Sequence, residues 1–174
     1  MHTTNSFEEG KVILINKPLG WTSFDVIRKL RSAINIKKIG HAGTLDPLAT
    51  GLLIICTGKF TKNINGYMAA EKEYTGTFTL GAVTPTYDLE SEPEQFKPID
   101  FVSAEMIQHT ALKFIGETDQ TPPVHSAIKQ GGKPVYLLAR KGINVKLQPR
   151  KIFISEFEII NIKLPVIAFR VVCA

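Results

Sequence analysis

The first third of the chain pairs an apolar run with a segment of helical spacing. Residues 11–16 (KVILIN) are mostly apolar and are followed by Pro18 and Gly20, which predicts a strand that ends in a turn. From Thr22 onward apolar residues recur at helical spacing, and Asp25 follows three residues after Thr22. This spacing is typical of a capping box. We therefore expect a strand, a turn and a helix.

The middle of the chain contains a glycine-rich segment and three further patterned segments. Residues 40–51 contain three glycines and are expected to form a loop. Residues 52–57 are predicted to be a buried strand, and residues 58–68 a helical segment. Residues 73–82 alternate between large and small side chains, as half-buried strands do. Acidic residues and prolines dominate residues 84–100, where we expect a surface loop.

The last third predicts a helix, an irregular arm and a hairpin. Helical spacing over residues 103–115 begins at Ser103, a good capping residue. Residues 121–142 are expected to be irregular, and residues 152–162 and 166–173 form an antiparallel hairpin. Helices and strands do not alternate as βαβ units. The predicted fold is therefore α+β, with a largely antiparallel mixed sheet flanked by helices.

Composition excludes several classes of protein. The 174 residues are 44% hydrophobic and 21% charged, which excludes disordered and collagen-like chains and fits one domain. No apolar run approaches the ~20 residues that span a membrane, and residues 1–10 do not resemble a signal peptide. We therefore expect a cytoplasmic protein without a membrane partner. Cys56 and Cys173 lie in apolar runs, which predicts reduced thiols rather than a disulfide.

Charge is distributed unevenly along the chain. Residues 1–70 carry 9 basic and 4 acidic side chains, residues 71–119 carry 3 and 10, and residues 120–174 carry 9 and 2. No acidic residue occurs between Gln120 and Ser155. A solvated basic face and a phosphate-binding surface explain such a segment equally well. Charge alone leaves both interpretations open.

The candidate chemistry is concentrated in residues 40–51 (GHAGTLDPLATG). The sequence contains no CxxC, HExxH, EF-hand or P-loop pattern, so we expect neither a metal ion nor bound ATP. Glycines allow a backbone to approach a ligand closely, and Pro47 favours an extended conformation at Asp46. Because Asp-Pro pairs are common in turns, a turn-capping role explains Asp46 better than catalysis does when this segment is taken alone.

Four segments together resemble one known family. GHAGTLDPLATG closely resembles the signature of the bacterial tRNA pseudouridine-55 synthases. KPLGWTS at 17–23, KEYTGTFTLGAVTPTYD at 72–88 and PPVHSAIKQGGKPVYLLARKG at 122–142 resemble that family's segments in the same order. The PLATG sequence after Asp46 is similar to the stand-alone enzymes rather than to their guide-RNA-dependent relatives. The resemblance thus implies a pseudouridine synthase-like fold with no guide RNA and no obligate protein partner.

The resemblance implies that a uridine in the T loop of tRNA, at position 55, is isomerised to pseudouridine without a cofactor. By match to the motif, Asp46 is the catalytic aspartate, acting as a nucleophile toward the sugar or as an acid and base. Tyr74 matches the tyrosine that packs against the target base, and His41 matches a histidine near the flipped nucleotide. Without the resemblance, Tyr74 is better explained as a core aromatic, and His41 equally well as a loop residue.

The same resemblance gives the basic segment at about 120–151 a role, because it matches the insertion with which this family grips the T arm. Basic side chains there are expected to contact phosphates without reading bases. At the end of the first predicted strand, a lysine is a further candidate for a phosphate or site contact. The residues with predicted RNA contacts are Lys17, Lys129, Lys133, Arg140 and Lys141.

The sequence departs from the family at its C-terminal end. Family members continue after a strand like FRVVC (169–173) with a segment whose arginine pairs with the catalytic aspartate, and usually with a small RNA-binding domain. Residues 1–174 then match the N-terminal part of the catalytic domain. We expect them alone to bind T-arm RNA weakly, to form no measurable pseudouridine and to leave the last strand as an unpaired sheet edge. The alternative is a catalytically silent module that binds or remodels tRNA.

Overall fold

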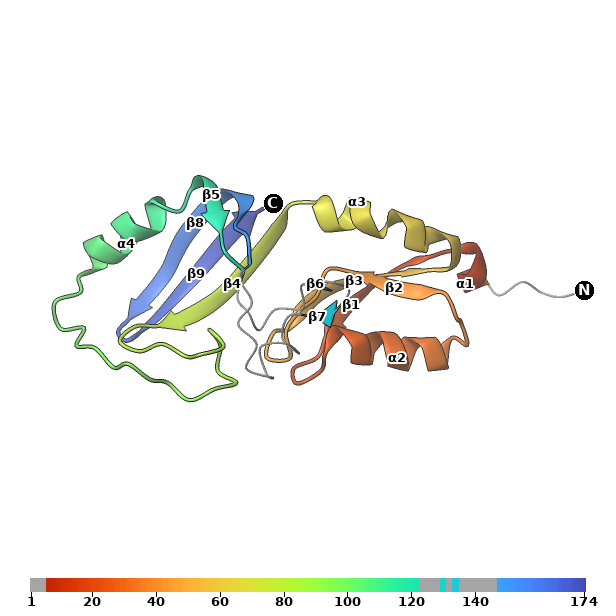
Figure 1. Ribbon diagram of the computed structural model, residues 1–174, viewed down its shortest axis with the longest axis horizontal. Helices are drawn as coiled ribbons and strands as arrows, with labels where there is room; N and C mark the ends of the chain where they lie inside the picture. The colour runs from red at the N-terminus through yellow and green to blue at the C-terminus, as the bar shows by residue number, and fades with distance from the viewer. Residues whose placement is uncertain (1–5, 123–128, 131–132, 135–146) are drawn as a thin grey trace, which may run out of the picture. The chain divides into compact units, whose positions relative to one another are not determined.

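The computed structural model describes residues 6–122, 129–130, 133–134 and 147–174 (Figure 1). The chain divides into two compact units, Met1–Ala70 and Glu71–Ala174, where its length alone favoured one domain. Each unit contains an antiparallel sheet with helices beside it. The α+β class with antiparallel sheets flanked by helices is therefore confirmed.

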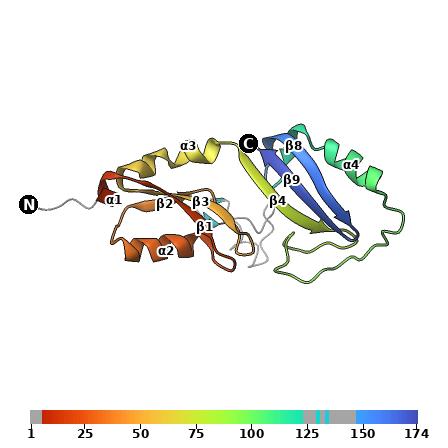
Figure 2. The same cartoon turned by 180° about the vertical axis from the view of Figure 1, so that it is seen from behind.

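The first unit is built on a sheet with the strand order β1-β3-β2 (Figures 1 and 2). Its elements are α1 (Ser6–Glu9), β1 (Val12–Lys17), α2 (Ser23–Ala33), β2 (Ile39–Ala42), β3 (Gly51–Thr57), the 3-10 helix η1 (Gly58–Asn63) and α3 (Ile64–Ala69). The predicted strand, turn and helix are confirmed. The expected loop over 40–51 is shorter than predicted, because His41 and its neighbours pair with β3.

Helix α2 begins at the predicted capping box. Thr22 Oγ1 accepts a hydrogen bond from Asp25 N at 3.1 Å, and the Asp25 carboxylate accepts one from Thr22 N at 3.0 Å. The buried face of α2 packs on β3, and the residues of this core are Val26, Ile27, Leu53 and Ile55. Because the core fixes α2 on the sheet, the first turn of α2 stays beside the loop that precedes β3.

The second unit is built on a sheet with the strand order β4-β9-β8-β5. Its elements are β4 (Lys72–Thr79), α4 (Ala104–Leu112), β5 (Gly116–Gln120), β6 (Lys129–Gln130), β7 (Lys133–Pro134), β8 (Arg150–Lys163) and β9 (Val166–Cys173). The predicted helix is capped by Ser103, whose hydroxyl accepts a hydrogen bond from Met106 N, and the predicted hairpin is β8-β9. We had expected the last strand to be an unpaired edge of the sheet, and this expectation is wrong. Strand β4 pairs with β9 along the whole length of β9.

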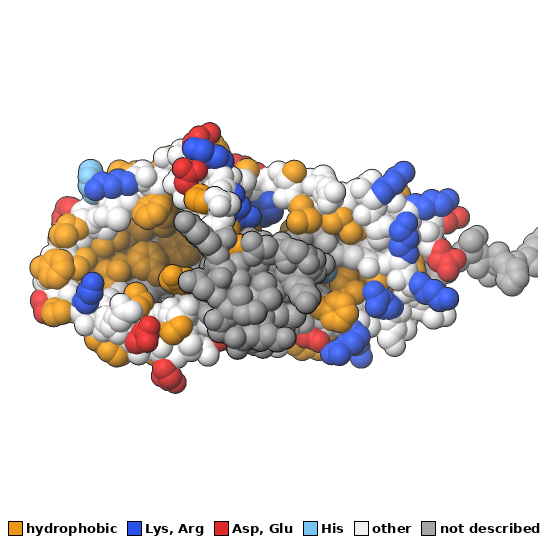
Figure 3. Space-filling view, in the orientation of Figure 1, with side chains coloured by type: hydrophobic (Ala, Val, Ile, Leu, Met, Phe, Trp, Pro, Cys, Tyr) orange, Lys and Arg blue, Asp and Glu red, His pale blue; other side chains and the backbone are white. Residues whose placement is uncertain are grey.

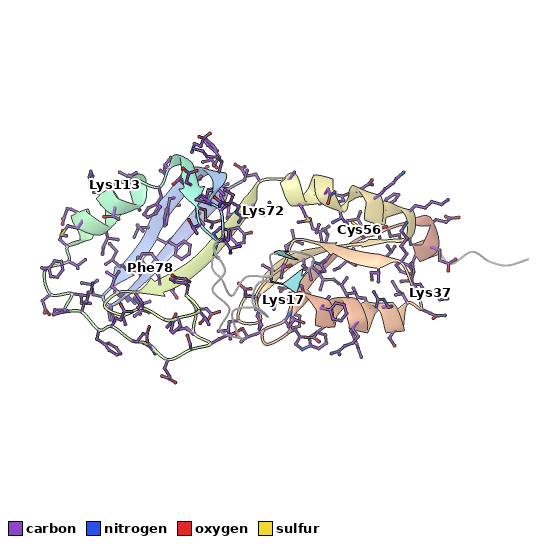
Figure 4. All side chains as sticks on the ribbon, viewed as in Figure 1. Lys17, Lys37, Cys56, Lys72, Phe78 and Lys113 are labelled. Carbon is purple, nitrogen blue, oxygen red and sulfur yellow. The ribbon has the colours of Figure 1, made fainter. Side chains whose placement is uncertain are left out.

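Aromatic rings cover part of the second sheet. The ring centroids of Phe78 and Phe169 lie 5.8 Å apart, as do those of Phe157 and Phe169. In the space-filling view, apolar side chains line a hollow over this sheet (Figure 3), and Phe78 is labelled on β4 (Figure 4). The second unit therefore has an apolar cluster of its own.

The state of the two cysteines and the lengths of the helices can be compared with the expectations from composition. Cys56 is a buried free thiol and Cys173 is a half-buried one, which confirms the expectation of reduced cysteines. Burial raises the pKa of the Cys56 thiol, so it stays protonated near neutral pH. Of the helices in the described ranges, none is long and apolar enough to cross a membrane.

Candidate functional site

The loop between β2 and β3 carries Asp46, and hydrogen bonds hold the residues on both sides of it. The Ser23 hydroxyl accepts a bond from Leu45 N at 2.9 Å and donates one to Leu45 O at 3.1 Å. On the other side, Gly20 N donates to Pro47 O at 2.8 Å. Ser23 is 2% exposed, so water does not compete for its bonds. The backbone around Asp46 is thus attached to α2 and to the turn before it.

Lys17, at the end of β1, contacts the same loop through its ammonium group. Its side chain is fully buried, and Nζ donates to the carbonyl oxygens of Trp21 at 2.5 Å, Pro18 at 3.1 Å and Pro47 at 3.4 Å (Figure 4). An ammonium group has three donors, and all three are directed at carbonyls of the protein. This geometry corrects the expectation that Lys17 contacts a phosphate and gives it a positioning role instead.

Glycines shape the two ends of this loop. Gly43 has φ +92° and Gly51 has φ +120°, a region that residues with a Cβ rarely adopt. Gly51 N also donates to Asn16 Oδ1 at 3.1 Å. Gly40 serves another purpose, since a Cβ there would lie 2.8 Å from Cδ1 of Ile64 in α3. Two of the three glycines therefore permit turns, and the third permits close packing.

The Asp46 side chain is exposed to solvent. Its backbone carbonyl accepts a hydrogen bond from Ala49 N at 3.0 Å, which closes a turn. Its carboxylate makes no hydrogen bond or ion pair with any residue in the described ranges. The turn-capping explanation of Asp46 therefore does not account for the side chain, which is available to a substrate.

His41 lies at the start of the Asp46 loop, in the same unit. Its Nδ1 is hydrogen-bonded to the carbonyl oxygen of Gly43. Because a carbonyl oxygen only accepts, Nδ1 carries the proton of this hydrogen bond. The ring is half-buried. One of the two predicted base-binding residues thus lies in the same unit as Asp46, on the strand that precedes its loop.

Tyr74, the second predicted base-binding residue, belongs to the other unit. It lies on β4 opposite Val171 of β9 and is 41% exposed. Burial, with a smaller contribution from Cys173, raises the pKa of the phenol. Tyr74 therefore remains a neutral phenol near neutral pH, and its exposed ring is available for stacking.

Of the predicted phosphate contacts in the arm, none has a described side chain. Lys129 pairs with Pro134 through β6 and β7, and Lys133 pairs with Gln130; only the backbone of these residues is described. Arg140 and Lys141 lie outside the described residues. Their roles therefore remain predictions.

The C-terminal end of the basic segment is paired with β5. Nε and Nη2 of Arg150 donate to Gln120 Oε1 at 2.9 and 2.7 Å. Lys151 Nζ lies 3.1 Å from Glu117 and 3.4 Å from Asp119, and the bond to Glu117 is the main cause of its raised pKa. Counting charges along the sequence did not indicate this compensation, since the partners lie about thirty residues earlier.

An ionic cluster joins three strands of the second sheet. Arg170 on β9 donates to Glu73 on β4 at 2.7 Å and to Glu156 on β8 at 2.5 Å. The hydrogen bond from Arg170 is the main cause of the lowered pKa of Glu73. The arginine therefore links β9 both to β8, its hairpin partner, and to β4, which lies far from it in the sequence.

No signal in the sequence had indicated Ser23 or Gly20 as supports of the site. They fall within KPLGWTS, the segment that resembles the family, and their partners are distant in sequence. Within the described ranges, no group of three or more His, Cys, Asp or Glu side chains is placed to hold a metal ion. The described site thus consists of one carboxylate, one imidazole and a fixed loop.

Comparison with known proteins gives consistent matches. Residues 31–174 match the family described as "TruB family pseudouridylate synthase (N terminal domain)". The tRNA pseudouridine synthase B of Flavobacterium johnsoniae is 51% identical over 99% of this chain and 78% of that protein. The enzyme of that name from Bacteroides fragilis is 47% identical over 97% of this chain and 75% of that protein.

The fold is similar to that of solved structures. A chain in the crystal structure of a Cbf5-Nop10-Gar1 complex superimposes with a TM-score of 0.66 at 26% identity, over 96% of this chain. A chain in an H/ACA RNP bound to a substrate RNA containing 2'-deoxyuridine superimposes with a TM-score of 0.62 at 24% identity. The present chain spans 40% and 38% of the lengths of those chains.

Proposed function

The chain belongs to the TruB family of pseudouridylate synthases, and from this we propose that it supplies Asp46 as the catalytic residue for the isomerisation of a uridine in the T loop of tRNA, at position 55, to pseudouridine. The observation that carries the proposal is the geometry of Asp46. Its neighbours Leu45 and Pro47 are fixed by hydrogen bonds, while its own carboxylate is exposed.

The reaction rearranges one nucleotide and needs no second substrate. The bond from N1 of uracil to ribose C1′ breaks, the base turns, C5 bonds to C1′, and the proton leaves C5 for N1 or solvent. A carboxylate serves this chemistry as a nucleophile at the sugar or as an acid and base. Both roles require a carboxylate that can reach the substrate from a fixed backbone, and Asp46 combines an exposed side chain with neighbours held by hydrogen bonds.

The target base has to leave the folded T loop before it reaches Asp46. Extruding a base costs a few kcal/mol. Contacts to the flipped base and to the flanking phosphates offset this cost. We assign the base contacts to His41 and Tyr74, whose ring face suits a detached uracil. We assign the phosphate contacts to the basic arm. Its residues with this predicted role are Lys129, Lys133, Arg140 and Lys141.

The partner in this proposal is the T arm of tRNA, without a guide RNA. The solved relatives come from Cbf5 complexes and an H/ACA RNP, whereas the curated relatives with higher identity carry the name tRNA pseudouridine synthase B. The PLATG sequence after Asp46 also favours stand-alone action. A reaction with tRNA as the only added macromolecule is therefore expected.

The proposal is tested by tritium release from tRNA labelled at C5 of uracil, with protein that spans the full catalytic domain. We expect release from tRNA with a T-loop uridine at position 55, and none from a matched transcript with cytidine there. Equal release from both transcripts would contradict the T-loop assignment. Tight tRNA binding with no release from either transcript would favour the silent binding module instead.

A further inference from the structure

A hollow on the first unit adjoins the Asp46 loop and has no part in the proposed reaction. Its volume is about 470 Å³, within the range of roughly 300–1,000 Å³ that is usual for ligand sites. The turn before α2 and the outer face of that helix form its walls. The lining residues are Gly20, Trp21, Asp25, Arg28, Lys29 and Ser32.

The lining combines an aromatic ring with two cations. Trp21 is 39% exposed, and Arg28 and Lys29 are exposed as well. The Asp25 carboxylate also faces the hollow, but it accepts hydrogen bonds from Thr22 N, from Thr22 Oγ1 and from Arg28. Because Arg28 Nη2 lies 2.6 Å from Asp25 Oδ1 in an ion pair, this pair is neutral as a whole, and Lys29 gives the lining its net positive charge.

The hollow and the Asp46 loop share their support. Lys17 Nζ donates both to Trp21 O and to Pro47 O, and Gly20 N donates to Pro47 O at 2.8 Å. These bonds lie within one compact unit. The position of the Trp21 backbone relative to the residue after Asp46 is therefore fixed, so the hollow and the Asp46 loop share one hydrogen-bonded support.

Positive charge continues beyond the hollow, along the same helix and the turn that follows it. In the space-filling view, basic side chains gather at this edge of the first unit (Figure 3). The exposed cations outside the lining are Arg31, Lys37 and Lys38. Such a series suits the repeated phosphates of a polynucleotide better than one small anion.

We propose that this hollow holds one unpaired nucleotide of the bound RNA, distinct from the target uridine. Its base stacks on the Trp21 indole, and its phosphate lies against Arg28 and Lys29. The exposed indole is the feature that selects a nucleotide over a simple anion, because a phosphate alone makes no use of an aromatic face. This inference rests on the proposed function, since it takes the ligand at Asp46 to be RNA.

Fluorescence reports on this hollow directly, because Trp21 is the only tryptophan in the chain. Titration with a T-arm hairpin RNA is expected to quench its emission, and to do so less at high salt. The double variant Arg28→Gln, Lys29→Gln is expected to lower the slope of log K against log salt by about one to two units. Trp21→Ala is expected to weaken binding roughly tenfold or more, as followed by anisotropy of a labelled RNA.

A matched control removes two charges from the same unit outside the hollow. Lys59→Gln, Lys62→Gln on η1 is expected to retain the quenching and the salt slope. Trp21→Phe keeps a stacking surface and is expected to retain most of the affinity, which separates loss of stacking from loss of folding. Thermal unfolding of each variant verifies that the fold is intact.

The outcomes separate this inference from the proposed function. RNA binding with unchanged Trp21 emission, together with unchanged affinity of the Arg28→Gln, Lys29→Gln variant, would overturn the nucleotide site. Equal quenching by inorganic phosphate or polyglutamate would overturn it in favour of a general anion site. RNA-specific quenching, together with no pseudouridine formation by protein that spans the full catalytic domain, would support the hollow as an RNA site and count against the catalytic proposal instead.

Discussion

Replacing Ser23 with alanine removes one of the attachments that hold the Asp46 loop. The hydroxyl makes two hydrogen bonds to the backbone of Leu45, at 2.9 and 3.1 Å, and the side chain is 2% exposed. A hydrogen bond contributes about 1 kcal/mol on average, and a buried group left without a partner costs about 1–3 kcal/mol. Since Leu45 is partly accessible to water, we expect a total cost of about 2–3 kcal/mol.

The loop borders solvent, so much of this cost is expected to appear as disorder of the Asp46 loop rather than as global unfolding. If all of it opposed the transition state, kcat/KM would fall by roughly 30- to 150-fold. We expect a fall of at least about tenfold, with tRNA affinity changed by less than about threefold. Tritium release under kcat/KM conditions and anisotropy with labelled tRNA measure the two effects separately.

Ser103→Ala is the matched control for this prediction. It also removes a hydroxyl that accepts a backbone hydrogen bond, here the N-cap bond from Met106 N at 3.2 Å, and is expected to cost about 1 kcal/mol of stability. It lies in the second unit and is expected to leave turnover unchanged. A wild-type kcat/KM for Ser23→Ala would refute the role of this hydroxyl in positioning Asp46.

Three further predictions, the second with a control variant, test other supports of the fold. Lys17→Met removes the ammonium donor from three carbonyls, of which those of Pro18 and Pro47 keep a backbone donor. It is expected to lower stability by about 2–4 kcal/mol, and an unchanged urea midpoint would contradict this. Gly58→Ala places a Cβ 2.1 Å from a carbonyl oxygen at φ +51° and should cost about 2–4 kcal/mol, whereas Gly66→Ala, in open space on α3, should be neutral or stabilise by up to about 1 kcal/mol. The bond from Arg170 lowers the folded-state pKa of Glu73 below its ordinary 4.5, so this contribution is present above pH 4.5 and is lost as pH falls through the folded pKa. The stability difference between wild type and Arg170→Met should therefore be larger at pH 7 than at pH 3, and equal differences at both would refute it.

Elements with local signals could be predicted from the sequence. The capping box of α2 depends on two residues three positions apart, and the β8-β9 hairpin on two long apolar runs with a short connection. Strand β5 was missed because GETDQ is polar and does not alternate; it is a strand because it pairs with β8. Strand β2 was missed because Gly40 within it resembles the start of the glycine-rich loop expected over residues 40–51. The division into two units falls where the net charge changes from positive in residues 1–70 to negative in residues 71–119, but the length of the chain favoured one domain.

The site could be predicted only in part, because some of its supports join residues that are distant in sequence. Asp46 and His41 stood in one contiguous motif. The support from Ser23 crosses 22 residues of sequence, and that from Lys17 to Pro47 crosses 30, so neither had a local signal. Lysines at strand ends are usually solvated, and Lys17 departs from that rule because three carbonyls converge on its ammonium group.

The role of Asp46 is tested most directly by the turnover of Asp46→Asn, in protein that spans the full catalytic domain. Asp100→Asn, at another exposed aspartate, is the matched control, and intact mass excludes deamidation back to aspartate. We expect no tritium release from C5-labelled tRNA by Asp46→Asn, tRNA affinity within about tenfold of wild type, and normal release by Asp100→Asn. Multiple turnover by Asp46→Asn would contradict the assignment of Asp46 as the catalytic residue.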